Sequence, residues 1–123
     1  MHATSRSTNL KHAIRSIPEG ESFSLLGDMT AEGGAMAGVI RVHDDRPAGS
    51  WECHPAGEEL LVLLDGRATM TVRGPDGSTR DHELAAGDVL LIPRDQPHSA
   101  RLHTPHIDVL FVTPRHGNRD WVE

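Results

Sequence analysis

Short hydrophobic stretches separated by turn residues are spread along most of the chain. Residues 36–42 (MAGVIRV), 59–64 (ELLVLL) and 89–92 (VLLI) are rich in aliphatic or β-branched side chains and are bounded by Gly, Asp or Pro. Residues 68–73 (ATMTVR) alternate apolar and polar side chains, as a half-buried strand does. This pattern predicts short β-strands rather than helices.

Further predicted strands cover residues 50–54, 79–84, 98–103 and 107–113. The connections between strands are short, and GPDGS at 74–78 is a strong hairpin signal because Pro presets one backbone angle and Gly allows a positive one. No connection leaves room for crossover helices. The chain is therefore predicted to be all-β, an antiparallel sandwich or barrel.

The length of 123 residues corresponds to one domain, so any active site must lie within this one fold. Residues 1–10 are polar and aperiodic, and we expect a flexible tail that is disordered or draped over the surface. Residues 11–123 are expected to form the domain. Before Pro18 the sequence fits a short extended arm or a turn of helix equally well.

The amino-acid composition argues against several kinds of binding partner and excludes one kind of catalytic group. The formal net charge is -6, with 18 acidic and 12 basic residues and no basic cluster, which argues against nucleic acid and anionic membranes as partners. No apolar stretch approaches the ~20 residues of a membrane span, and the start has no signal-peptide core, so a cytoplasmic protein is expected. Tyrosine is absent, which excludes a phenolic acid or base.

The segment WECHPAGEE at 51–59 carries the candidate chemistry. On a strand, Glu52 and His54 point to the same face, and the turn after His54 returns the chain so that Glu59 faces the same interior. His98 follows a second turn at the start of a later strand. Carboxylates and imidazoles that converge from several strands predict a metal site with a rigid ligand set.

Two motifs resemble those of the cupin family. His54, Glu59 and Gly66 fit the spacing of the first cupin motif, over about 46–66, and Gly87, Pro93 and His98 fit the second, over about 87–102. Twenty residues lie between the two motif glycines, a usual length for a compact cupin. The resemblance implies a cupin-type antiparallel β-barrel, or jelly roll, that binds one divalent ion (Fe, Mn, Zn or Ni).

The sequence also departs from the family pattern. Glu52 stands where the first motif has its first His, Arg46 replaces that motif's opening Gly, and Asp95 replaces the Gly after the Pro of the second motif. Two interpretations of Glu52 remain open. It is a fourth metal ligand beside His54, Glu59 and His98, or it stays free as a general base beside a 2-His-1-carboxylate set.

The resemblance implies a metal-dependent enzyme that acts on a small organic molecule, by dioxygenase, isomerase, cyclase or lyase chemistry. Cupins host all of these reactions, and the fold does not choose among them. The alternative is a non-catalytic small-ligand-binding or sensor module, and a metal-free structural cupin is a third possibility. Family tendency further implies a homodimer, since open sheet edges otherwise invite uncontrolled association.

Overall fold

The computed structural model describes residues 3–21, 26–27 and 29–123, and nearly all of its regular structure is β-strand. The predicted strands are present, and their ends differ from the predicted ones by at most one residue. In chain order the elements are β1 Arg6–Asn9, α1 Leu10–Arg15, β2 Ala35–His43, β3 Ser50–Cys53, β4 Glu59–Asp65, β5 Arg67–Arg73, β6 Thr79–Ala85, β7 Asp88–Ile92, β8 His98–Leu102, β9 His106–Pro114 and β10 Arg119–Val122.

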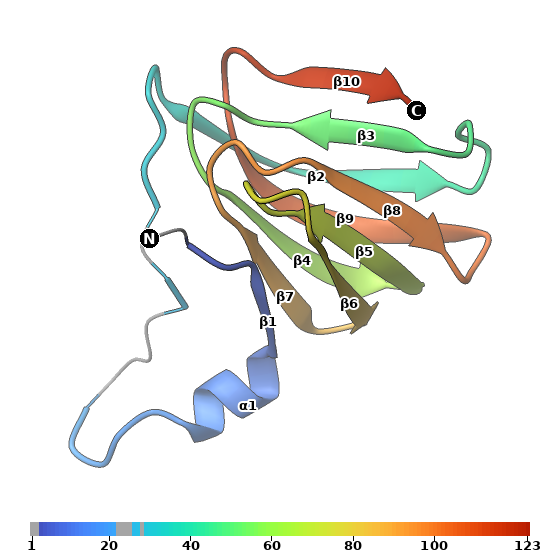
Figure 1. Ribbon diagram of the computed structural model, residues 1–123. Coiled ribbons are helices and arrows are strands. Elements are labelled where there is room, and N and C mark those ends of the chain that lie inside the picture. Colours follow the sequence, from blue (N-terminus) through green and yellow to red (C-terminus); the bar gives the residue numbers. More distant parts are fainter. Residues whose placement is uncertain (1–2, 22–25, 28) are drawn as a thin grey trace.

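Within the described residues, the strands form two five-stranded sheets that pair antiparallel throughout. One sheet has the order β1-β7-β4-β9-β2 and the other the order β10-β3-β8-β5-β6. The two sheets lie face to face, and α1 lies outside them at the end of β1 (Figure 1). The predicted fold class, a cupin-type antiparallel jelly roll, is confirmed.

The N-terminal segment differs from the expected flexible tail. Arg6–Asn9 forms strand β1 and pairs antiparallel with β7, in register from Arg6 opposite Leu91 to Asn9 opposite Asp88. The ambiguous segment that follows forms the short helix α1. Asn9 begins this helix, since its side-chain oxygen accepts a hydrogen bond from the Lys11 backbone N–H at 2.9 Å. A polar edge strand carries no hydrophobic alternation, which is why the sequence pattern missed β1.

The turn at Gly66, the last residue of the first motif, connects β4 to β5. Gly66 is the single residue between β4 and β5 and has a φ of 88°. A Cβ at this position would lie 2.6 Å from the backbone oxygen of His106. Both the left-handed backbone and the close approach of β9 require glycine here.

The hydrophobic core lies between the two sheets and extends up to the candidate metal ligands. Its buried members come from strands of both sheets, so burial there holds the two layers together. They are Leu63, Ala68, Met70, Val72, Leu84, Leu90, Ile92, Ile107 and Val109.

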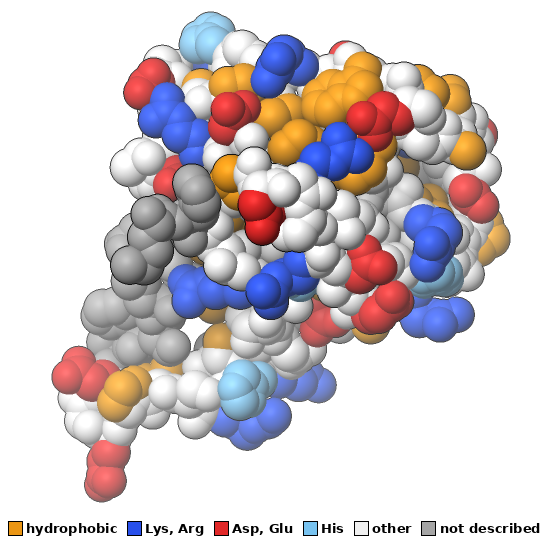
Figure 2. Space-filling model, viewed as in Figure 1, with side chains coloured by type: hydrophobic (Ala, Val, Ile, Leu, Met, Phe, Trp, Pro, Cys, Tyr) orange, Lys and Arg blue, Asp and Glu red, His pale blue; other side chains and the backbone are white. Residues whose placement is uncertain are grey.

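Acidic and basic side chains are interspersed over the face of the molecule that Figure 2 shows. No helix in the described part of the chain is long and apolar enough to cross a membrane.

Candidate metal centre

The four predicted ligands come from three strands that meet at one end of the space between the sheets. Glu52 lies on β3 and His54 directly after it, Glu59 begins β4, and His98 begins β8. Glu52 and His98 are direct cross-strand partners, so their side chains leave the sheet on the same face. The alternation inferred from the sequence therefore does bring the four side chains together.

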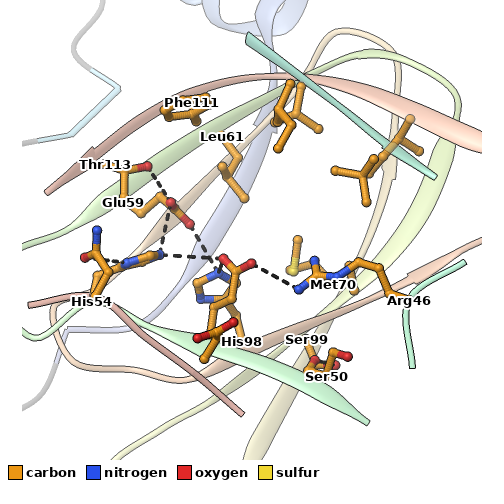
Figure 3. Close-up of a pocket in the computed structure, with 18 of the residues that line it drawn as sticks. Arg46, Ser50, His54, Glu59, Leu61, Met70, His98, Ser99, Phe111 and Thr113 are labelled. Atoms are coloured by element: carbon orange, nitrogen blue, oxygen red, sulfur yellow. Dashed lines mark hydrogen bonds and ion pairs between the residues drawn. The ribbon is translucent and has the colours of Figure 1, made fainter. Parts of the chain in front are cut away.

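Distances between the four side chains are those of a single cluster. The Nε2 atoms of His54 and His98 lie 3.1 and 3.2 Å from the Glu59 carboxylate oxygens. The nearer Glu52 oxygen lies 4.0 and 3.5 Å from the same two Nε2 atoms. One ligand atom each from Glu52, His54 and His98 lies within 4.8 Å of the others. Figure 3 shows His54, Glu59 and His98 pointing toward a common centre.

A hydrogen-bond chain through Asn118 determines the tautomer of His54. The Asn118 amide nitrogen donates to the backbone oxygen of Pro114 at 2.8 Å, so its Oδ1 faces His54 Nδ1 at 2.9 Å. Nδ1 must then be the protonated nitrogen, and the lone pair of Nε2 points into the cluster. This is the arrangement that a metal-ligating histidine needs, with its second nitrogen held by an outer partner.

The Nε2 atom of His54 is buried and has no hydrogen-bond partner among the described residues. A lone pair aimed at a carboxylate 3.1 Å away is repulsive unless a cation lies between them. Either a shared proton or a metal ion supplies that positive charge. The donor set, two imidazoles and two carboxylates, therefore fits a divalent ion.

Glu59 is fixed in place more firmly than Glu52. Its side chain is 6% exposed and accepts a hydrogen bond from Thr113 Oγ1 at 2.5 Å. Glu52 is 38% exposed and forms an ion pair with Arg46 at 3.3 Å. A buried carboxylate with an oriented partner suits a ligand, and a more accessible one has room for either of its two predicted roles.

The charges of the cluster favour bound cations. The hydrogen bond with His98 holds the pKa of Glu52 at about 2, against the opposing effect of burial. Burial alone would lower the pKa of His54, but its interactions with the Glu59 carboxylate outweigh that effect, and the pKa is raised. The lowered pKa keeps the Glu52 carboxylate ionised, and the raised pKa of His54 shows that the negative charge beside it favours a cation there.

The turn of the second motif is tied to the first motif through Asp95. This residue has a φ of 60° and is the only described residue other than glycine with a positive φ. Its backbone N–H donates to the His54 oxygen at 3.1 Å, and its carboxylate accepts from the buried Cys53 thiol at 3.3 Å. Asp95 thus takes the strained conformation expected of the family glycine and adds contacts that glycine lacks.

A second group of possible ligands lies at the edge of the β4–β9–β2 sheet. Ligand atoms of Asp65, His106 and Asp108 lie within 4.8 Å of one another. Arg41 already binds the Asp108 carboxylate through two nitrogens, at 2.7 and 2.9 Å. This exposed cluster is satisfied by an arginine, and we assign no metal to it.

Comparison with known families agrees with this geometry. A model of the cupin domain matches residues 38–113, which is more than half of the chain and contains all four candidate ligands. The chain belongs to the cupin family. No curated protein matches its sequence.

Solved structures of oxalate decarboxylases have a similar fold. One that addresses substrate binding and reaction specificity shares 24% identity at a TM-score of 0.56, over 72% of this chain and 23% of that chain. The Lactobacillus farciminis enzyme in its formate complex shares 23% identity at 0.56, over 72% and 26%. The Bacillus subtilis enzyme, studied for its Mn(II) centers, shares 18% at 0.56, over 89% and 30%.

Sequence identities at this level support a shared fold. They do not support transferring the activity of these enzymes to this chain. The chain spans less than a third of the length of each of these neighbours.

Sequence reasoning did not identify two residues that support the cluster. Thr113 was assigned only to a strand, and Asn118 lies in a segment, RHGNR, that has no hydrophobic pattern. Their roles depend on side-chain contacts across 54 and 64 residues of sequence. No local signal in the sequence carries that information.

Proposed function

We propose that this cupin binds one divalent metal ion on Glu52, His54, Glu59 and His98 and is a metal-dependent enzyme acting on a small organic molecule. The observation that carries the proposal is the buried, unpartnered His54 Nε2, held with its lone pair toward the Glu59 carboxylate. An ion bound there would satisfy both groups at once.

Two carboxylates balance the charge of a divalent ion, and a mixed oxygen and nitrogen donor set suits Mn, Fe, Zn or Ni. When bound, such an ion supplies Lewis acidity to a substrate oxygen, or a position for dioxygen. The Mn(II) centers named for the Bacillus subtilis oxalate decarboxylase support Mn among these candidates. Dioxygenase, isomerase, cyclase and lyase chemistry all fit this donor set.

We assign Glu59 as a ligand and give Glu52 one of two roles. As a ligand, it completes a set of four protein donors. As a base, it accepts a substrate proton at Oε2, which lies on the cavity side within 3.5 Å of His98 Nε2. Its greater exposure, 38% against 6% for Glu59, supports this second role.

Metal content of protein purified without chelator tests the central part of this proposal. We expect about one ion per chain in the wild type and at least about tenfold weaker binding in His98→Gln and Glu59→Gln. His103→Gln and Glu83→Gln are matched controls, because these two side chains pair with each other on the outer face. Metal-free wild-type protein, or equal loss in the controls, would contradict the assignment.

Glu52→Gln separates the two roles of Glu52. Loss of much of the metal identifies a ligand, and retained metal with lost turnover identifies a base. Oxygen uptake with candidate diketones or thiols supplies the activity readout for the dioxygenase branch. Retained metal together with unchanged turnover would rule out both roles.

A ligand-binding module without catalysis is the second candidate. It is favoured by the cavity that contains the cluster, about 350 Å³ in volume and lined by side chains from both sheets. Binding of a small molecule that is recovered chemically unchanged, in protein with full metal content, would support this alternative over the enzyme.

We also propose a homodimer, formed through the β2 edge of its sheet. β2 is nine residues long, has β9 as its only described neighbour in the sheet, and exposes Val39 to 72% and Ile40 to 50%. Long apolar edge strands favour association with a second chain. Light scattering after size exclusion should give twice the chain mass, and Val39→Lys should shift it toward the monomer.

A further inference from the structure

The cavity that contains the candidate metal ligands extends well beyond them, between the two sheets. Its volume of about 350 Å³ holds roughly ten water-sized groups, at about 30 Å³ each. Oxalate has six non-hydrogen atoms and would leave much of that space empty. The shape and charge of the cavity therefore carry information about the substrate class.

Much of the cavity wall is apolar. Strands β2, β4, β5 and β9 contribute long aliphatic or aromatic side chains; in Figure 3 Leu61 and Phe111 lie on the side of Glu59, and Met70 lies beside Arg46. Apolar surface of this kind binds hydrocarbon and not a second charged group. The apolar lining residues are Met36, Ile40, Val42, Leu61, Met70, Ala100, Ile107, Val109 and Phe111.

Arg46 is the guanidinium available to a ligand in this cavity. It lies in the loop between β2 and β3, lines the cavity, and contacts Glu52 through one nitrogen at 3.3 Å (Figure 3). Arg119 also lines the cavity, and it has two partners, Asp95 at 3.6 Å and the Cys53 sulfur at 4.0 Å. Arg46 thus keeps donors free for a bidentate contact with a carboxylate.

The apolar wall limits the ligand to one negative group. Arg46 pairs with Glu52 through one nitrogen, and its remaining donors can bind one carboxylate. A dicarboxylate would bring its second negative charge against the apolar wall.

We infer that the substrate is an amphipathic monocarboxylate, with its carboxylate between Arg46 and the candidate metal position and its apolar body against β2, β4 and β9. This inference rests on the proposed metal site, and it goes beyond it by naming the substrate class and the residue that selects it.

Calorimetric titration of the protein as purified, with its metal content measured on the same sample, tests the inference. The probes are acetate, butyrate and hexanoate, the neutral isostere hexanamide, and oxalate. We expect affinity to rise about fourfold for each added methylene and hexanoate to bind at least tenfold more tightly than hexanamide. Oxalate should bind more weakly than hexanoate.

Arg46→Gln should reduce the preference for hexanoate over hexanamide by at least about tenfold. Arg101→Gln is the matched control, because Arg101 is exposed on β8 and is not part of the cavity lining. Tighter binding of oxalate than of hexanoate, or an unchanged preference in Arg46→Gln, would overturn the inference. If the sample contains metal and the preference is missing, this inference alone fails; metal-free protein instead overturns the proposed function.

Discussion

The amide of Asn118 determines which nitrogen of His54 carries a proton, although Asn118 itself is not a candidate ligand. Its nitrogen is committed to Pro114 and its oxygen to His54 Nδ1. Nε2 is left to face the cluster as an acceptor. At the scale of single residues, this contact is the strongest support for a metal site.

Asn118→Ala should weaken metal binding by about 10- to 100-fold, because His54 loses the partner that orients its ring and holds its tautomer. Competition with a chelator of known affinity measures the change. Asn9→Ala is the control, since Asn9 bonds to Asp88 far from the cluster. Unchanged affinity in Asn118→Ala would show that the tautomer is fixed in another way.

A pair of substitutions at Asp95 isolates the cost of its backbone conformation. Both Asp95→Gly and Asp95→Ala remove the contacts of the carboxylate with Cys53 and Arg119. Only alanine retains a Cβ at a φ of 60°. The glycine variant should be more stable than the alanine variant by about 1 kcal/mol, measured by denaturant unfolding. Equal stability would mean that the turn relaxes.

Strand β1 is held to the molecule by side chains as well as by its pairing with β7. His82 on β6 is buried, and its two ring nitrogens lie 2.9 Å from Ser5 Oγ and 3.2 Å from Ser7 Oγ. These contacts connect the N-terminal segment to the second sheet. They explain why a polar segment without periodicity is nevertheless ordered as a strand.

The pairing of β1 should weaken in mild acid. Burial, followed by the charge of Arg80, lowers the pKa of His82 below 6.5 against the opposing effect of Asp81. The folded state therefore binds this proton more weakly than the unfolded chain does. The contribution of His82 to stability is complete above about pH 6.5 and is lost as pH falls from there through the lowered folded pKa.

Denaturant unfolding of wild type and His82→Gln at pH 7.5 and pH 5 measures this effect. The wild type should lose more stability between the two values than the variant does, because glutamine keeps hydrogen-bonding groups and cannot be protonated in this range. All other ionisable side chains are the same in both proteins, so the difference belongs to His82. Parallel losses would contradict the account of β1.

For the whole molecule, the alternation of apolar and polar positions predicted most of the strands and the fold class. It missed β1 and β10, which are four-residue edge strands with few apolar side chains. Such strands are specified by pairing with neighbours distant in sequence, Leu91 in one case and Trp51 in the other. The local pattern of apolar and polar residues therefore does not predict that pairing.

The candidate site also combines features that the local sequence predicts with features that only the fold creates. Glu52, His54, Glu59 and His98 follow from strand parity and motif spacing, both of which are local in sequence. The tautomer of His54, the buried bond between Thr113 and Glu59 and the approach of Arg46 depend on the folded sheets. Those contacts could therefore be identified only from the structure.

Metal should stabilise the whole fold, because the ligands join strands of both sheets and are not assembled in the unfolded chain. At a free metal concentration of 100 times Kd, the free energy of unfolding should rise by about 2.7 kcal/mol. Thermal unfolding with added metal and with chelator measures the shift, and His98→Gln should remove most of it. An equal shift in that variant would place the ion elsewhere.

Anomalous diffraction from crystals grown with Mn²⁺ or Zn²⁺ tests the existence of the metal centre most directly. The account predicts one strong peak within about 2.0–2.4 Å of His54 Nε2, His98 Nε2 and a Glu59 oxygen. It would be contradicted by the lack of a peak there, or by a dominant peak at Asp65, His106 and Asp108.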